Sequence, residues 1–144
     1  YSAICLAEGL APNGKLITIE VNEEFEERII NNINKSNNSN KIELKIGNAL
    51  NIIPTLGIKF DLVFIDADKL NYINYYNAVF DMVNVGGIII SDNVLWDNKV
   101  VDETKNDATT QLIREFNVFL KNDKRTEKVL IPLRDGLFVS RKIS

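Results

Sequence analysis

Polar residues follow several short apolar runs of this sequence, at the points where those runs end. Asp66 comes directly after FDLVFI, and Asp92 and Asn93 come directly after GIIIS. If the two runs are neighbouring strands, about 4.8 Å apart, the three side chains bring their oxygens around one point. Mg²⁺ and Ca²⁺ prefer such oxygen ligands. The spacing predicts a site for a hard divalent cation; the alternative is that these residues are ordinary helix caps.

The composition excludes other common catalytic and metal sites. The 144 residues include no histidine and one cysteine, Cys5. Without histidine there is no Ser-His-Asp triad and no histidine metal site. A single cysteine forms neither an internal disulfide nor a zinc cluster, and we expect Cys5 to be packed on an apolar helix. Proton transfer and metal binding must therefore use Asp, Glu, Asn, Lys or Tyr.

Two further charged residues lie where they could reach a ligand. Lys69 follows Asp66 by three positions, and a cation beside a lysine lowers its pKa, which suits a general base. The alternative is a surface lysine paired with Asp68.

Glu20 has the place of the acid that binds the ribose diol in nucleotide-binding βαβ units, about 20 residues after a glycine-rich loop. No GxGxxG is present, and the alternative is a favourable charge at the start of a helix.

Short β-branched runs alternate with segments of helical period, which predicts an α/β fold with a mostly parallel sheet and helices on both faces. A C-terminal antiparallel hairpin is predicted around the turn at Asp135-Gly136. The expected strands are 15–21, 41–46, 60–65, 88–90, 127–131 and 137–141, with a turn at 85–87, and the expected helices are 22–33, 49–56, 70–83 and 104–121. Because ligands bind beyond the carboxyl ends of parallel strands, we expect Glu20, Asp66 and Asp92 to face one crevice.

Charge and hydropathy narrow the classes of partner. The net charge of −3 gives no electrostatic footprint for nucleic acid, and no segment approaches the roughly 20 apolar residues of a membrane span. Tyr1 does not begin a signal peptide, which predicts an upstream segment. Trp96, followed by a polar stretch, is either a substrate wall beside a lid or a core residue.

Several motifs are shared with a known family. They are YSA at 1–3, IEVN at 19–22, FDLVFIDADK at 60–69, NY at 71–72, SDNVLW at 91–96 and LRDGL at 133–137. Together they resemble the cation-dependent class I O-methyltransferases of the caffeoyl-CoA and catechol type, which use S-adenosylmethionine. The resemblance runs from Tyr1 to Lys142. It implies a Rossmann-like sheet, with residues 1–144 forming the C-terminal major part of one methyltransferase domain.

The resemblance implies a role for each matching residue. Ser2 would contact the carboxylate end of S-adenosylmethionine, Glu20 its ribose and Ala49 its adenine. Asp68 and Tyr75 would help hold the methionine part, and Asp66 would also contact the cofactor. A divalent cation, Mg²⁺ or Ca²⁺, would be bound by Asp66, Asp92 and Asn93. Lys69 would be the catalytic base and Trp96 would contact the substrate.

The resemblance implies that a cytoplasmic homodimer methylates a small phenolic substrate, either catechol-like or hydroxycinnamoyl. A related alternative is methylation of a hydroxylated uridine in tRNA, against which the acidic balance argues. A magnesium-binding receiver domain is an alternative of another class, because FDLVFID resembles a phosphoacceptor strand. Receivers need an acidic pair after the first strand and a lysine after the last, and neither is in place. The last alternative is an inactive structural fragment.

The sequence departs from the family pattern in two places, and each departure leads to an expectation about the structure. The family's first strand and glycine loop would precede Tyr1, and that strand is central to the sheet. Without it we expect two halves with exposed edges, and residues 1–144 alone to be poorly stable or unable to bind the cofactor. Asn98 stands where the family often has glycine, and asparagine tolerates the left-handed conformation that this turn needs.

Overall fold

The computed structural model describes residues 1–144. The chain divides into two compact units, Tyr1–Leu56 and Gly57–Ser144, and each is described by itself. The strands form two sheets, one with β1 and β2 and one with the order β3-β4-β6-β5. None of the helices has the length and apolar character needed to cross a membrane.

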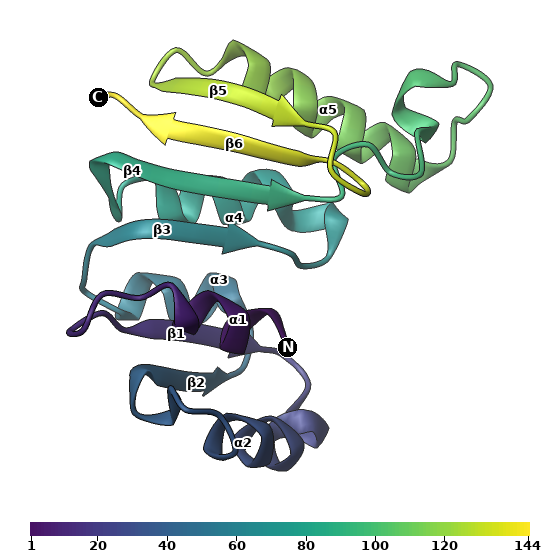
Figure 1. Ribbon diagram of the computed structural model, residues 1–144. Helices are drawn as coiled ribbons and strands as arrows, with labels where there is room; N and C mark the ends of the chain where they lie inside the picture. The colour runs from purple at the N-terminus through teal and green to yellow at the C-terminus, as the bar shows by residue number, and fades with distance from the viewer. The chain divides into compact units, whose positions relative to one another are not determined.

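The first unit is a parallel strand pair with helices on both faces. It contains α1 (Ser2–Glu8), β1 (Leu16–Glu20), α2 (Glu26–Asn34), β2 (Ile42–Ile46) and α3 (Ala49–Ile52). The pairing runs from Leu16 with Ile42 to Glu20 with Ile46, and α1 and α3 lie on opposite faces of the pair (Figure 1). The buried cluster of this unit is Ala7, Ile33 and Ile42, with partly buried aliphatic side chains around it.

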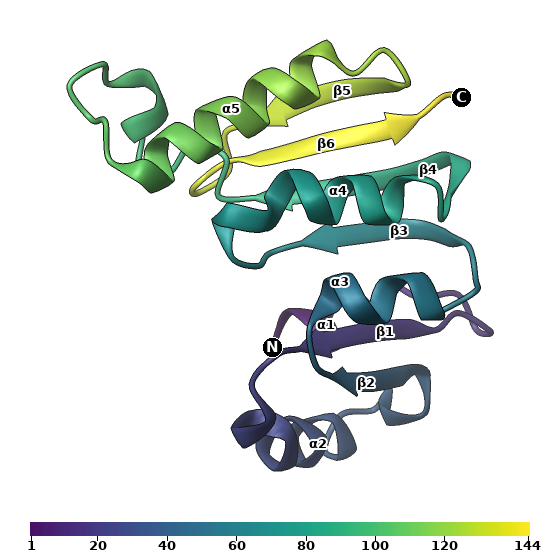
Figure 2. The ribbon, with the colours of Figure 1, turned by 180° about the vertical axis from the view of Figure 1, so that it is seen from behind.

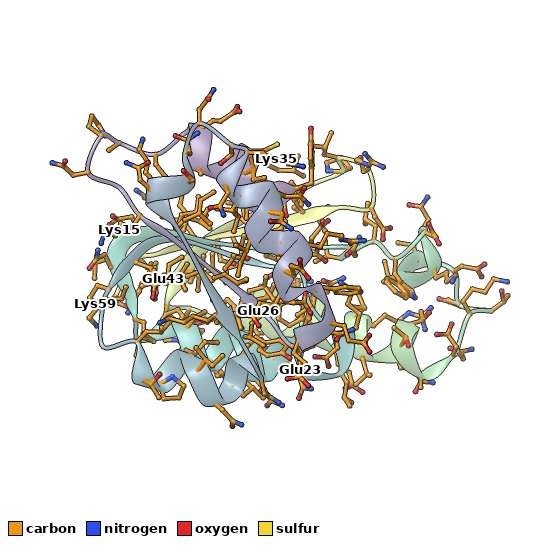
Figure 3. The ribbon with its side chains drawn as sticks, turned by 90° about the horizontal axis from the view of Figure 1, so that it is seen from below. Lys15, Glu23, Glu26, Lys35, Glu43 and Lys59 are labelled. Atoms are coloured by element: carbon orange, nitrogen blue, oxygen red, sulfur yellow. The ribbon has the colours of Figure 1, made fainter.

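The start of α2 shows how local sequence fixes an element. The side chain of Asn22 accepts the backbone N–H of Glu24 at 3.0 Å, and acidic residues occupy the first turns of the short 3₁₀ helix and of α2. Figure 3 shows Glu23 and Glu26 at this end and Lys35 at the other. Negative charge at the N-terminus and positive charge at the C-terminus complement the helix dipole. The predicted cap at Asn22 is confirmed.

The second unit is a mixed four-stranded sheet. It contains β3 (Phe60–Ile65), α4 (Tyr72–Phe80), β4 (Val83–Asp92), α5 (Ala108–Asn122), β5 (Thr126–Ile131) and β6 (Leu137–Lys142). Strands β3 and β4 are parallel, and β6 pairs antiparallel with both β4 and β5. Both α4 and α5 cover the same face of this sheet (Figure 2). The predicted C-terminal hairpin is confirmed.

Several predicted boundaries and burials are wrong for physical reasons. The helix predicted to reach 83 ends at Phe80, because Val83 is buried and pairs with Phe60 at the start of β4. The residues of the turn predicted at 85–87 lie within this strand as an irregularity, where the pairing register shifts and Gly86 has a φ of 85°. Helix α5 begins at Ala108 rather than at 104, because the Asp107 side chain caps it by accepting the N–H of Thr110 at 3.0 Å.

Two residues expected to be covered are exposed. Cys5 is exposed, because α1 turns Ala7 toward the core and position 5 lies on another side of the helix. Strand β3 was expected to be covered on both faces, yet Leu62 is 45% exposed. Strand β3 is an edge of its sheet, so its side chains have fewer neighbours than those of a central strand.

An ion pair closes the core of the second unit. Tyr76 lies 5.5 Å from Phe119, ring centre to ring centre, and its hydroxyl donates to Asp123 at 3.1 Å. The guanidinium of Arg125 donates to both oxygens of Asp123 at 2.9 and 2.8 Å and covers the Phe80 ring at 3.7 Å. These hydrogen bonds, that of Arg125 first, lower the pKa of Asp123 to about 2.

We predict that Asp123→Asn lowers the free energy of unfolding by about 2 kcal/mol at pH 7. The folded-state pKa lies below the ordinary value, so the carboxylate stabilises the protein above about pH 4 and loses this effect as the pH falls toward 2. Chemical denaturation at a series of pH values should therefore show the difference between wild type and variant shrinking below pH 4. Glu127→Gln, in an exposed ion pair with Arg141, is the control and should cost less than about 1 kcal/mol. An equal loss at pH 7 and pH 2 would contradict the prediction.

Candidate functional site

The strand register of the second unit brings the predicted cation ligands to one sheet edge. Ile65 pairs with Ser91 in the parallel β3 and β4 ladder. Asp66, which follows β3, and Asp92, which ends β4, are therefore neighbours at the carboxyl ends of the two strands. Asn93 comes next, with a left-handed φ of 58°. Its N–H donates to Asp92 Oδ1 at 2.6 Å.

Lys69 places its ammonium among these oxygens. Its Nζ lies 3.6 Å from Asp66 Oδ1 and donates to Asn93 Oδ1 at 2.8 Å. The side chain is only 10% exposed, so the alternative of a surface lysine paired with Asp68 is wrong. Burial lowers the pKa of Lys69, and the negative charges of Asp66 and Asp92 oppose that shift.

Tyr72 is part of this site, although the sequence analysis assigns it no role. It is almost fully buried, and its hydroxyl accepts a hydrogen bond from Lys69 and donates to the backbone oxygen of Asp92 at 3.1 Å. Lys69 Nζ also lies 4.4 Å from the centre of the Tyr72 ring. Burial raises the pKa of the Tyr72 hydroxyl. The sequence feature that could have identified Tyr72 is its three-residue spacing from Lys69, which brings positions 69 and 72 together at the start of a helix.

The donor set fits a hard cation with an open coordination sphere. In this structure the ammonium of Lys69 is the cation that Asp66 and Asn93 contact. The set offers two carboxylates and one amide oxygen, and no group of three or more His, Cys, Asp or Glu side chains is gathered anywhere. Mg²⁺ is commonly held by one or two carboxylates together with water and substrate oxygens. The residues present are sufficient for that arrangement.

Asp68 and Tyr75 are also brought together. The Tyr75 hydroxyl donates to Asp68 Oδ2 at 2.5 Å, and the amide of Asn71 donates to Asp68 Oδ1 at 2.8 Å. Burial, followed by the hydrogen bond and charge of Asp68, raises the pKa of Tyr75 to about 12. The phenol is therefore a proton donor at neutral pH, and it fixes the orientation of the carboxylate.

The first unit places Glu20 and Ala49 at the carboxyl ends of its own strands. Glu20 ends β1, and its backbone oxygen accepts the N–H of Gly47 at 2.8 Å. Ala49 begins α3, after the Asn48 cap. Glu20 Oε1 accepts the N–H of Asn22 at 2.8 Å, so Glu20 does help to start the next helix, and its second oxygen has no such bond. Ser2 lies exposed at the start of α1.

Trp96 belongs to a tightly bent segment beyond Asn93. Trp96, Asp97 and Asn98 all have left-handed φ values, of 50°, 53° and 61°, as predicted for Asn98. The indole is half-buried, with Lys69 Nζ 5.9 Å and Lys99 Nζ 5.8 Å from its ring centre. Trp96 is thus not a fully buried core residue, and its ring lies beside Lys69.

Comparison with known proteins gives the class. A family model described as O-methyltransferase matches residues 1–143. The chain is 34% identical to caffeoyl-CoA O-methyltransferase 1 of Arabidopsis thaliana and to caffeoyl-CoA O-methyltransferase 2 of Petunia hybrida, covering all of this chain and 60% and 64% of those proteins. The chain therefore belongs to the O-methyltransferase family, and it spans about three fifths of the length of these curated relatives.

Solved structures agree with this class. The O-methyltransferase from Bacillus cereus in complex with SAH matches 99% of this chain and 69% of its own, with a TM-score of 0.89 and 31% identity. TomG from Streptomyces achromogenes in complex with SAM matches 100% of this chain and 69% of its own, with a TM-score of 0.90 and 29% identity. The Rossmann-like fold is confirmed, and the receiver-domain interpretation is wrong.

Proposed function

We propose that the protein transfers a methyl group from S-adenosylmethionine to a phenolic hydroxyl of a substrate with two adjacent hydroxyls, such as a catechol or a hydroxycinnamoyl ester. The observation that carries the proposal is the placement of Lys69 between Asp66 and Asn93 at the ends of two paired strands. Two relatives act, by their names, on caffeoyl-CoA. Two structural neighbours are complexes with SAM or SAH.

The proposed cation ligands are Asp66, Asp92 and Asn93, with Mg²⁺ or Ca²⁺ as the ion. A phenol has a pKa near the ~10 of tyrosine and is a poor nucleophile at neutral pH. The ion, when bound, would lower that pKa and favour substrates that offer two neighbouring oxygens. Asp66, whose side chain is 51% exposed, is accessible to a ligand, and the Asn93 amide oxygen already faces a positive charge.

Lys69 is the proposed base. Its side chain is largely buried, and its nitrogen lies against the two oxygens that would face the reacting hydroxyl. Tyr72 and Trp96 flank it, so its movement is restricted and water is partly excluded. A base in a fixed position typically contributes about 10²–10⁴-fold to a rate. This role rests on position and on the absence of any histidine.

The proposed cofactor contacts follow from the resemblance, and each is described within its own unit. S-Adenosylmethionine supplies the methyl group. Glu20 would accept hydrogen bonds from the ribose diol with its free oxygen, and Asp68, oriented by Tyr75, would hold the ammonium of the methionine part together with Asp66. Ser2 and Ala49 would contact the carboxylate end and the adenine. A homodimer in the cytoplasm is the proposed state, and it rests on the resemblance alone.

The first test measures methyl transfer by the full-length protein to caffeate-like diols and to tRNA that carries the hydroxylated uridine. We expect transfer to the diols and its loss in EDTA, with recovery on adding Mg²⁺.

Asp92→Ala should reduce kcat/KM by at least about 10²-fold, because it removes a ligand, and excess Mg²⁺ should not restore it. Asp61→Asn, an exposed residue of β3 bonded to Asn84, is the control and should be unaffected. Activity that EDTA does not change would contradict the cation, and transfer only to tRNA would contradict the acceptor.

A second test separates the base from the ligands. Lys69→Met should lower kcat by about 10²-fold or more. Calorimetric titration with Mg²⁺ should show affinity that is equal or higher, because a positive charge beside the ligand oxygens has been removed. A Lys69→Met protein that keeps its kcat, or that loses Mg²⁺ binding, would assign Lys69 another role.

A third test concerns the cofactor. Glu20→Gln should weaken S-adenosylmethionine binding about tenfold in calorimetry, because the ribose hydroxyls lose a charged acceptor. Glu43→Gln removes a carboxylate from the neighbouring strand, where it is exposed and paired with Lys45 at 2.6 Å. This control should bind the cofactor normally. Equal affinity in both variants would place the ribose elsewhere.

A further inference from the structure

The segment from Asn93 to Asp102 contains several residues in the left-handed backbone conformation. Four of its non-glycine residues have left-handed φ values: Asn93, Trp96, Asp97 and Asn98. Asparagine and aspartate tolerate this conformation, but for a bulky residue such as Trp96 it is unfavourable and persists only where the surroundings enforce it. This site segment also supplies Asn93 and Trp96, the residues next to Lys69. The contacts that enforce the shape of this segment therefore affect acceptor binding.

The first anchor is the turn between β5 and β6. Asp135 Oδ1 accepts the N–H of Asp97 at 2.6 Å, and the Asp135 backbone oxygen accepts the N–H of Leu95 at 2.9 Å. Gly136 takes a φ of 84°, and a Cβ added to it would lie 2.5 Å from Leu95 Cγ. The turn thus touches the segment too closely for any side chain at position 136.

The second anchor is Arg114 of α5, which holds the end of the segment. Its guanidinium donates to three backbone oxygens: those of Lys99 at 2.9 Å, Val100 at 3.0 Å and Asp102 at 2.7 Å. A planar group with several N–H donors in a fixed fork can satisfy these acceptors together, which lysine cannot. The two anchors therefore hold the segment from both ends.

We infer that Asp135 and Arg114 are positioning residues for the methyl acceptor. They act through Trp96 and Asn93, whose places they fix by holding the backbone on either side. Asp97, Asn98, Arg134 and Asp135 also line a hollow of about 290 Å³, so the contact between turn and segment shapes the surface next to Trp96. The identity of the methyl acceptor rests on the proposed function. The anchoring of the segment rests on the hydrogen bonds alone.

The kinetic test compares Asp135→Ala and Arg114→Ala with matched variants of the full-length protein. Each alanine should raise the acceptor KM about tenfold and lower kcat/KM about 10–100-fold, because displacement by about 1 Å costs that much. KM for S-adenosylmethionine should change less than about twofold. A merely destabilised protein would instead lose kcat in proportion to its active fraction, with KM unchanged.

The control variants isolate the hydrogen bonds. Asp135→Asn keeps an oxygen that can accept the Asp97 N–H while removing the charge that acts on Lys69, so it should retain the wild-type acceptor KM. Arg141→Ala removes an arginine of the same sheet that pairs with Glu127 on the surface, and it too should be unchanged. If Asp135→Asn raised KM as much as Asp135→Ala, charge rather than anchoring would be responsible and the inference would fail.

A second readout does not depend on activity. Trp96 is the single tryptophan of the 144 residues, and subtracting the spectrum of a Trp96→Phe variant isolates its emission in the full-length protein. The two alanine variants should shift this emission to the red and increase its quenching by acrylamide, whereas Asp135→Asn should not. Unchanged Trp96 emission in both alanine variants would overturn the inference even if the enzyme were active. A red shift in a protein without methyl transfer would keep the anchoring and reject the proposed function. Arg114→Lys, which cannot bond all three oxygens, provides a milder change with the same expected direction and serves as the test if an alanine variant fails to fold.

Discussion

The parallel pairing of β3 with β4 is the constraint on which the candidate site depends. With Ile65 opposite Ser91, the residues that follow both strands must leave the sheet at the same edge. A shift by one residue would turn Asp92 to the other face of its strand and separate it from Asp66. Burial of Ile65, Ile89 and Ser91 holds the register, so the packing of the sheet decides where the charges meet.

The carboxylates of the second unit divide into two kinds according to how many partners they have. Asp123 accepts from Arg125 and Tyr76 and is nearly buried, so its bonds are used within the fold. Asp66 has a single distant contact with Lys69 and is half exposed. Asp123 therefore helps to hold α5 to the sheet, whereas the carboxylate of Asp66 keeps lone pairs that a ligand can use.

The sequence allowed the strand ends to be predicted because a buried strand shows a continuous apolar run and its end shows a polar residue. That is why Asp66, Asp92 and Asn93 could be placed together. Tyr72 and Arg114 could not be assigned in this way, since their roles depend on backbone oxygens of residues 92 and 99–102. The start of β4 at Val83 was missed because its pairing with Phe60 is a tertiary contact. Helical period alone could not separate it from α4.

The contact between the segment after β4 and the turn at 134–136 joins two parts of the chain that are far apart in the sequence. A ribosome makes Asn93 and Trp96 long before it makes Asp135, and domains complete their packing only when all partners have emerged. Until the final hairpin has been synthesised and docked, the backbone of Leu95 and Asp97 lacks the acceptors that fix it. The surface that carries the candidate site is therefore completed only after β6 has been made, and a chain that stops before β6 lacks both a strand and the shape of that surface.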